Sequence, residues 1–186
     1  RVRDHNEDCV ELRPEIGLYV LADGMGGYNA GEVASGMATS LIADGLAEYW
    51  NPREVDGLAR EEAMSLAERL IREQIARANT AIFTTSQNNP ECAGMGTTLV
   101  VCLFYETEPE DLYLLCSDGL NDMVEDEEIR LTLLTLRSNP SLTVQQLVQA
   151  ANDNGGRDNV SAMLVRVAEP FAVPRGWLAR FKALFR

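Results

Sequence analysis

The sequence predicts an α+β protein in which amphipathic helices pack on β-sheets. Two kinds of segment point to this fold. Short, continuous apolar runs such as Leu18–Ala22 are typical of buried strands, and longer segments with apolar residues at every third or fourth position are typical of helices. The chain has 186 residues, of which 46% are hydrophobic, enough for one domain with a sizeable core.

In the first half, the strand Cys9–Leu12 and the run Leu18–Ala22 flank a short turn, which predicts a β-hairpin. Two helices are expected next. In the first, Val33, Met37 and Leu41 recur every four residues and define the expected apolar face. In the second, the apolar positions are Met64, Ala67, Ile71, Ile75, Ala78 and Ile82.

The second half repeats the alternation of strands and helices. The apolar run Leu99–Phe104 predicts a buried strand, and Leu112–Cys116 predicts another. Two further helices are expected, one around Ile129 and one capped by Thr143. The strand Val160–Val167 follows them.

The net charge of −13 argues against nucleic acid as a partner and suits metal cations, although a solvated acidic surface would give the same total. No stretch is long and apolar enough to cross a membrane, so we expect a cytoplasmic protein. The four cysteines have no CxxC spacing, and three of them lie in or beside apolar runs, which favours buried thiols over disulfides or zinc ligands.

Acidic residues recur at the ends of the predicted strands. An Asp-Gly pair alone is typical of a turn. Here, however, an aspartate abuts an apolar strand and a glycine turn three times, and an acidic pair precedes the first strand. These acids are Asp23, Asp118, Asp158 and the pair Glu7-Asp8.

If these strands share one core, their acids can gather at one edge of it. The carboxylates would then repel one another unless a cation neutralised them. The set contains neither histidine nor cysteine, and oxygen ligands select hard ions such as Mg²⁺ or Mn²⁺. The pattern therefore predicts a metal site.

Five motifs of this chain, in order, resemble those of the metal-dependent protein phosphatases (PPM family, type 2C serine/threonine phosphatases) in their bacterial form. They are Arg3-x-x-Asn6-Glu7-Asp8, Ala22–Gly27, Gly94–Thr98, Cys116–Leu120 and Gly156–Asn159. The resemblance implies a four-layer sandwich, with two antiparallel β-sheets flanked by helices on both faces. It also implies hydrolysis of phosphoserine and phosphothreonine on proteins by a metal-activated water.

The resemblance also assigns the acids to two Mg²⁺ or Mn²⁺ ions, with a third ion possible. Asp23 would bridge the two ions, and the backbone carbonyl of Gly24 would bind one of them. Glu7 and Asp8 would complete the shell of that ion, directly or through ordered water.

The other residues carried over are Asp118 and Asp158, which would hold the second ion, and Arg3, which would bind the substrate phosphate through its planar guanidinium. Arg3 and Asp23 are thus the expected catalytic residues. A surface ion pair of Arg3 with Asp4 or Glu7 is the alternative. Thr97 and Thr98 are expected to satisfy backbone groups near the site.

The chain departs from the family between Phe104 and Pro109, where relatives carry a long segment with two central strands and an acid for the third ion. Either the native protein carries that segment and this chain joins its two sides, or the chain is a truncated relative. A truncated relative would favour the alternative function of a pseudophosphatase acting as a protein-binding module. We expect a catalytic domain over residues 1–168 in which this central segment is absent.

Residues 169–186 are expected to form a linker and a basic amphipathic helix. Trp177, Phe181, Leu184 and Phe185 align on one helical face, so residues 175–186 could lie on a membrane surface, continue into an anchor or dock on the acidic body. The resemblance implies a monomer that acts on phosphorylated proteins, the substrates of a serine/threonine kinase.

Overall fold

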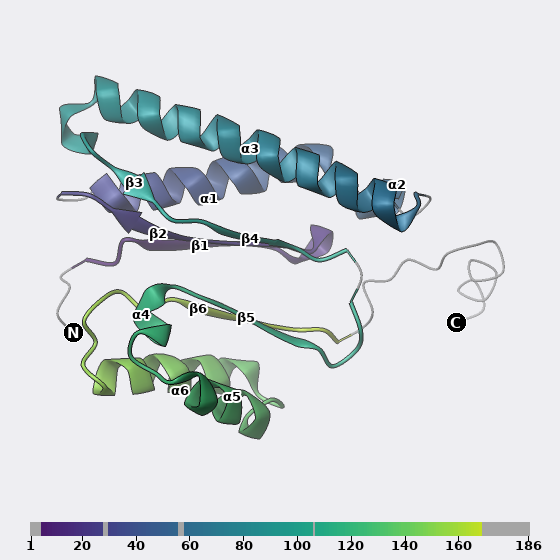
Figure 1. The fold of residues 1–186 in the computed structure, drawn as a ribbon, viewed down its shortest axis with the longest axis vertical. Coiled ribbons are helices and arrows are strands. Elements are labelled where there is room, and N and C mark those ends of the chain that lie inside the picture. Colours follow the sequence, from purple (N-terminus) through teal and green to yellow (C-terminus); the bar gives the residue numbers. More distant parts are fainter. Residues whose placement is uncertain (1–4, 28–29, 56–57, 106, 169–186) are drawn as a thin grey trace.

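The computed structural model describes residues 5–27, 30–55, 58–105 and 107–168. It confirms the predicted α+β fold. Figure 1 shows its elements stacked in four layers, with one sheet and its helices above and the second sheet and its helices below. Residues 169–186, for which a linker and tail helix were predicted, lie outside the described residues.

The first sheet is built around its central strand, β2 (Leu18–Met25). It pairs antiparallel with β1 (Asp8–Arg13) on one side, and with β3 (Gly96–Thr97) and β4 (Val100–Leu103) on the other. A short 3₁₀ helix, η1 (Pro14–Ile16), connects β1 to β2. The predicted hairpin is therefore confirmed.

The second sheet pairs β5 (Leu112–Cys116) antiparallel with β6 (Ala162–Arg166). Between these strands the chain forms α4 (Asp118–Asn121), α5 (Asp126–Thr135) and α6 (Pro140–Asp153). In the part of the chain that the structure describes, this sheet has two strands only, so each has one edge without a neighbouring strand.

The helices α1 (Ala30–Tyr49) and α3 (Arg60–Asn88) cover the outer face of the first sheet (Figure 1). The short elements α2 (Pro52–Val55) and η2 (Pro90–Cys92) flank α3. The predicted apolar face of α1 is wrong at Val33 and Leu41, which are exposed, whereas Met37 packs against the core. The buried face carries Ala34, Ala38 and Ile42 instead, and its small side chains let the helix lie close to β2.

Three further expectations for single elements differ from the structure. On α3, Met64 and Ile75 of the expected apolar face are exposed. Thr143 does not cap α6 but lies inside it. The cap is Asn139, whose side chain accepts a hydrogen bond from the backbone N–H of Leu142 at 3.2 Å. The strand predicted over Leu99–Phe104 is shorter, and it is half-buried because it lies at the edge of its sheet.

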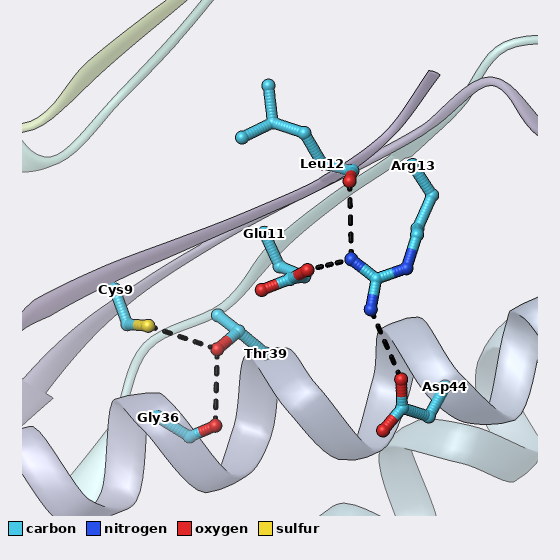
Figure 2. A network of polar contacts seen from close by, with 7 residues as sticks. All are labelled: Cys9, Glu11, Leu12, Arg13, Gly36, Thr39 and Asp44. Atoms are coloured by element: carbon cyan, nitrogen blue, oxygen red, sulfur yellow. Dashed lines mark hydrogen bonds and ion pairs between the residues drawn. The ribbon is translucent and has the colours of Figure 1, made fainter. Parts of the chain in front are cut away.

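The side chains of β1 alternate between two layers. Figure 2 shows Cys9, Glu11 and Arg13 on the side of α1, where Thr39 lies within hydrogen-bond distance of Cys9 Sγ and Arg13 pairs with Glu11 and with Asp44. Leu12 points to the opposite side. Since alternate residues of a strand share a face, Asp8 also points away from α1, toward the second sheet.

The core between the sheets is formed by Leu21 with Leu115, Met163 and Val165. Leu21 lies on β2 and is 1% exposed, and the other three lie on β5 and β6. This cluster fixes the spacing between the two sheets. By contrast, Val10 on β1 is 39% exposed.

No helix in the described ranges is long and apolar enough to cross a membrane. The four cysteines are free, as predicted, but of the four Cys92 is buried while Cys9, Cys102 and Cys116 are half-buried.

We expect Leu21→Ala to lower the free energy of unfolding by about 2–5 kcal/mol, because it leaves a cavity between the sheets. Val10→Ala is the control, and its cost is expected to stay within about 1 kcal/mol because Val10 is already partly exposed. Urea unfolding followed by circular dichroism measures both. Equal losses for the two variants would contradict the assignment of Leu21 to the core between the sheets.

Candidate metal centre

The strand pairing brings two of the predicted acids face to face. Asp8 on β1 and Asp23 on β2 are direct partners in the antiparallel ladder. Side chains at such positions have Cβ atoms about 4.5–5.5 Å apart, and like charges there destabilise the sheet. The first sheet therefore carries two opposed carboxylates at one end.

The backbone of Asp23 is held by two threonines. Thr97 Oγ1 donates to the carbonyl oxygen of Asp23 at 2.9 Å, and the backbone N–H of Thr98 donates to the same oxygen at 2.8 Å. The N–H of Asp23 donates to Thr98 Oγ1 at 3.3 Å. These contacts confirm that Thr97 and Thr98 satisfy backbone groups near the site.

Hydrogen bonds from three separate parts of the chain fix the backbone of Glu7. Its N–H donates to Asn159 Oδ1 at 2.9 Å. Its carbonyl oxygen accepts hydrogen bonds from Ser35 Oγ of α1 at 2.6 Å and from the N–H of Gly24 at 3.1 Å. Glu7 is thus held in place although it precedes the first strand.

Two glycines make room for this arrangement. A Cβ on Gly31, at the start of α1, would lie 2.4 Å from Glu7 Oε1. A Cβ on Gly24 would lie 2.1 Å from the carbonyl oxygen of Gly31 and 2.7 Å from that of Glu7. All three distances are far below van der Waals contact, so β2, α1 and the acidic segment (residues 5–8) can approach this closely only with glycine at these positions.

The other two acids come from the second sheet. Asp118 begins α4 directly after β5, and Asp158 lies in the loop before β6. Asp158 Oδ1 accepts a hydrogen bond from the backbone N–H of Asn159 at 2.8 Å. The chain order therefore delivers these acids to the end of the second sheet.

Acids from both sheets raise the pKa of one carboxyl group, that of Asp23. The pKa of Asp23 is raised from 3.8 to about 7, first by burial and then by the negative charges of Asp8, Asp118 and Asp158. A hydrogen bond with Asp118 raises it further. A bound cation would reverse the effect of these charges.

Two oxygen atoms of the acidic segment fit a cation. Glu7 Oε1 and Asp8 Oδ1 are buried and have no hydrogen-bond partner within the described structure. Buried carboxylate oxygens without a donor are costly, and hard cations such as Mg²⁺ and Mn²⁺ bind such oxygens. In the same described residues, no group of three or more His, Cys, Asp or Glu side chains lies close enough together to hold a metal ion as it stands.

Of the predicted site residues, the structure thus brings Glu7, Asp8, Asp23, Asp118 and Asp158 to one end of the two sheets. The backbone of Gly24 lies beside them. Arg3, the predicted phosphate ligand, falls outside the described residues.

Sequence reasoning missed the residues that support these acids. They are Gly31, Ser35, Ser117 and Asn159. Ser117 and Asn159 stand directly beside Asp118 and Asp158 in the sequence, a position that could have marked them. Gly31 and Ser35 carry no such signal, because their contact with Glu7 depends on how α1 packs.

The chain is similar to the serine/threonine phosphatase stp of Listeria welshimeri, with 32% identity over 139 residues that take up 69% of this chain and 52% of the relative. It is also 25% identical, over 240 residues, to the serine/threonine phosphatase stp of Listeria monocytogenes, covering 89% of this chain and 91% of the relative. No protein-family profile matches the chain.

Among solved structures, the chain resembles the catalytic domain of the serine/threonine protein phosphatase PstP in complex with two manganese ions. The TM-score is 0.70 at 25% identity, and the match covers 91% of this chain and 94% of that chain. Its fold and its motifs therefore agree with the same group of proteins. The chain belongs to the metal-dependent protein phosphatase family.

This phosphatase-family chain differs from its relatives in length. The match to the first Listeria protein spans about half of that protein, 52%. The match to the second extends over 240 residues, more than the 186 of this chain, so that relative carries residues that this chain lacks.

We expect Gly31→Ala to weaken Mn²⁺ binding by about 10–100-fold, because the added methyl group displaces the Glu7 carboxylate. Gly36→Ala, in the same helix, is the control, since a Cβ there meets no atom within 4 Å. Isothermal titration calorimetry measures the affinities. If both variants bind Mn²⁺ as tightly as the unaltered chain, Glu7 does not contribute to the site.

Proposed function

We propose that this chain hydrolyses phosphoserine and phosphothreonine on proteins, with two Mg²⁺ or Mn²⁺ ions held by its acids. The observation that carries the proposal is the convergence of Asp8, Asp118 and Asp158 on Asp23, whose pKa they raise together with burial. Relatives named serine/threonine phosphatases, and the PstP domain solved with two manganese ions, support the same chemistry.

In this proposal, Asp23 would hold both ions, as its central position among the acids suggests. Glu7, Asp8 and the carbonyl of Gly24 would serve one ion, and Asp118 and Asp158 would serve the other. Bound ions lower the pKa of a coordinated water and neutralise the charge that develops on the phosphate.

The substrate must also be bound. We propose that Arg3 binds the phosphate group of the substrate, because its guanidinium can donate two parallel hydrogen bonds to it. Arg3 precedes Glu7 by four residues, and Glu7 is itself fixed at the site, which supports this assignment.

We further propose that residues 1–168 form the catalytic domain, and that the residues present only in relatives fall between Phe104 and Pro109. The chain passes there from β4, at the edge of the first sheet, to β5 of the second. Both strands have an edge without a neighbour in the described structure, and additional strands could pair there.

The proposal includes narrower expectations about context. The substrates would be proteins phosphorylated by a serine/threonine kinase, and the phosphatase would act as a cytoplasmic monomer. Residues 175–186 would contact a membrane surface or a partner. Liposome flotation with and without these residues tests the membrane contact, and equal flotation would exclude it.

Hydrolysis of a phosphothreonine peptide with Mn²⁺ tests the central proposal. We expect Asp23→Asn to lower kcat/KM by at least about 100-fold, because it removes the bridging carboxylate. Asp153→Asn, an equivalent change at an exposed position of α6, should leave the rate unchanged. Equal rates for the unaltered chain and Asp23→Asn would contradict the mechanism. Peptide binding without hydrolysis by the unaltered chain would favour the pseudophosphatase alternative.

A further inference from the structure

Ser117 and Asn159 connect the second sheet to the acidic segment of the first. Both lie at the end of the second sheet where Asp118 and Asp158 lie, and both hydrogen-bond residues between His5 and Asp8. Neither is expected to bind a metal ion itself. Their contacts suggest a different contribution to the site.

Ser117 orients the carboxylate of Asp8. Its side chain is almost completely buried, with 3% of the residue exposed. The hydroxyl accepts a hydrogen bond from the N–H of Ser161 at 3.0 Å and donates to Asp8 Oδ2 at 2.8 Å. Asp8 Oδ1 is buried without a partner in the described structure. The bond from Ser117 thus occupies one oxygen of Asp8 and leaves the other available to a cation.

Asn159 holds the backbone on either side of Asn6. Its Oδ1 accepts from the N–H of Glu7 at 2.9 Å, and its Nδ2 donates to the carbonyl oxygen of His5 at 2.8 Å. The oxygen and the nitrogen of the Asn159 side-chain amide therefore both hydrogen-bond a segment that lies at least 152 residues earlier in the chain. These two bonds fix Glu7 relative to the second sheet.

The two residues belong to one rigid unit. The N–H of Ser117 donates to the carbonyl oxygen of Ser161 at 3.0 Å, which extends the pairing of β5 and β6. A Cβ on Gly119 would lie 2.0 Å from the carbonyl oxygen of Asn159, so the loop before β6 packs directly on the start of α4. A movement of one residue would move the other.

We propose that Ser117 and Asn159 are positioning residues that hold Asp8 and Glu7 at the metal centre. We call the pair the inter-sheet clamp. This inference rests on the proposed function, since it assigns the clamp to one of the two ions. The clamp opposes the repulsion between acids of the two sheets and presents Asp8 Oδ1 and Glu7 Oε1 in fixed positions.

Mn²⁺ titration of the full chain by calorimetry tests the clamp without measuring activity. We expect Ser117→Ala and Asn159→Ala each to weaken one of the two binding steps by about 10–100-fold, with the other step less affected. Ser117→Thr retains the hydroxyl and should retain most of the affinity. Circular dichroism is used to check that each variant is folded.

Thr143→Val is the matched control. Thr143 carries a buried hydroxyl on α6, which donates to the backbone carbonyls of Leu136 and Asn139 at 2.9 Å. Its loss should lower stability and leave Mn²⁺ affinity unchanged. A purely structural role of Ser117 would give the same result as this control.

A double-mutant cycle decides whether Ser117 acts through Asp8. If it does, Ser117→Ala should have little further effect on Mn²⁺ affinity in the Asp8→Asn chain. Full additivity would overturn the inference, as would equal weakening by Ser117→Ala and Ser117→Thr. Two tightly bound Mn²⁺ ions in every clamp variant would overturn the clamp alone. Absence of Mn²⁺ binding by the unaltered chain would overturn the proposed function as well.

Discussion

Repulsion between carboxylates is the constraint on which the rest of this structure depends. Asp8 and Asp23 are opposed in one ladder, and Asp118 and Asp158 approach from the other sheet. Burial, together with the negative charges of these three acids, raises the pKa of Asp23 to about 7. Such an arrangement costs stability unless a cation neutralises it. Binding of Mg²⁺ or Mn²⁺ is therefore coupled to the stability of the end of both sheets.

The fold holds these acids together through contacts that leave little space. The cluster around Leu21 sets the distance between the sheets, and Gly24 and Gly31 let β2, α1 and the acidic segment approach one another. Asn159 connects that segment to the second sheet. A site assembled from both sheets needs all of these contacts, because a small shift of either sheet would separate the ligands.

The sequence was sufficient to predict the fold class, the hairpin and the acids, because local patterns carry that information. Asp23 and Asp118 each follow an apolar strand and precede a glycine. The buried face of α1 could not be predicted in the same way. Val33 and Leu41 have larger apolar side chains than Ala34, but α1 packs so closely on β2 that the small Ala34 is buried while Val33 and Leu41 are exposed. Contacts such as that of Ser35 with Glu7 depend on tertiary packing, and no local pattern encodes them.

Anomalous diffraction from crystals grown with Mn²⁺ tests the central claim most directly, because it locates the ions without reference to activity. The account predicts two anomalous peaks about 3.5–4 Å apart. One carboxylate oxygen of Asp23 should lie near each peak, with Asp8 on one side and Asp118 and Asp158 on the other. No peak at this end of the sheets, or a single peak that Asp23 does not contact, would contradict the account.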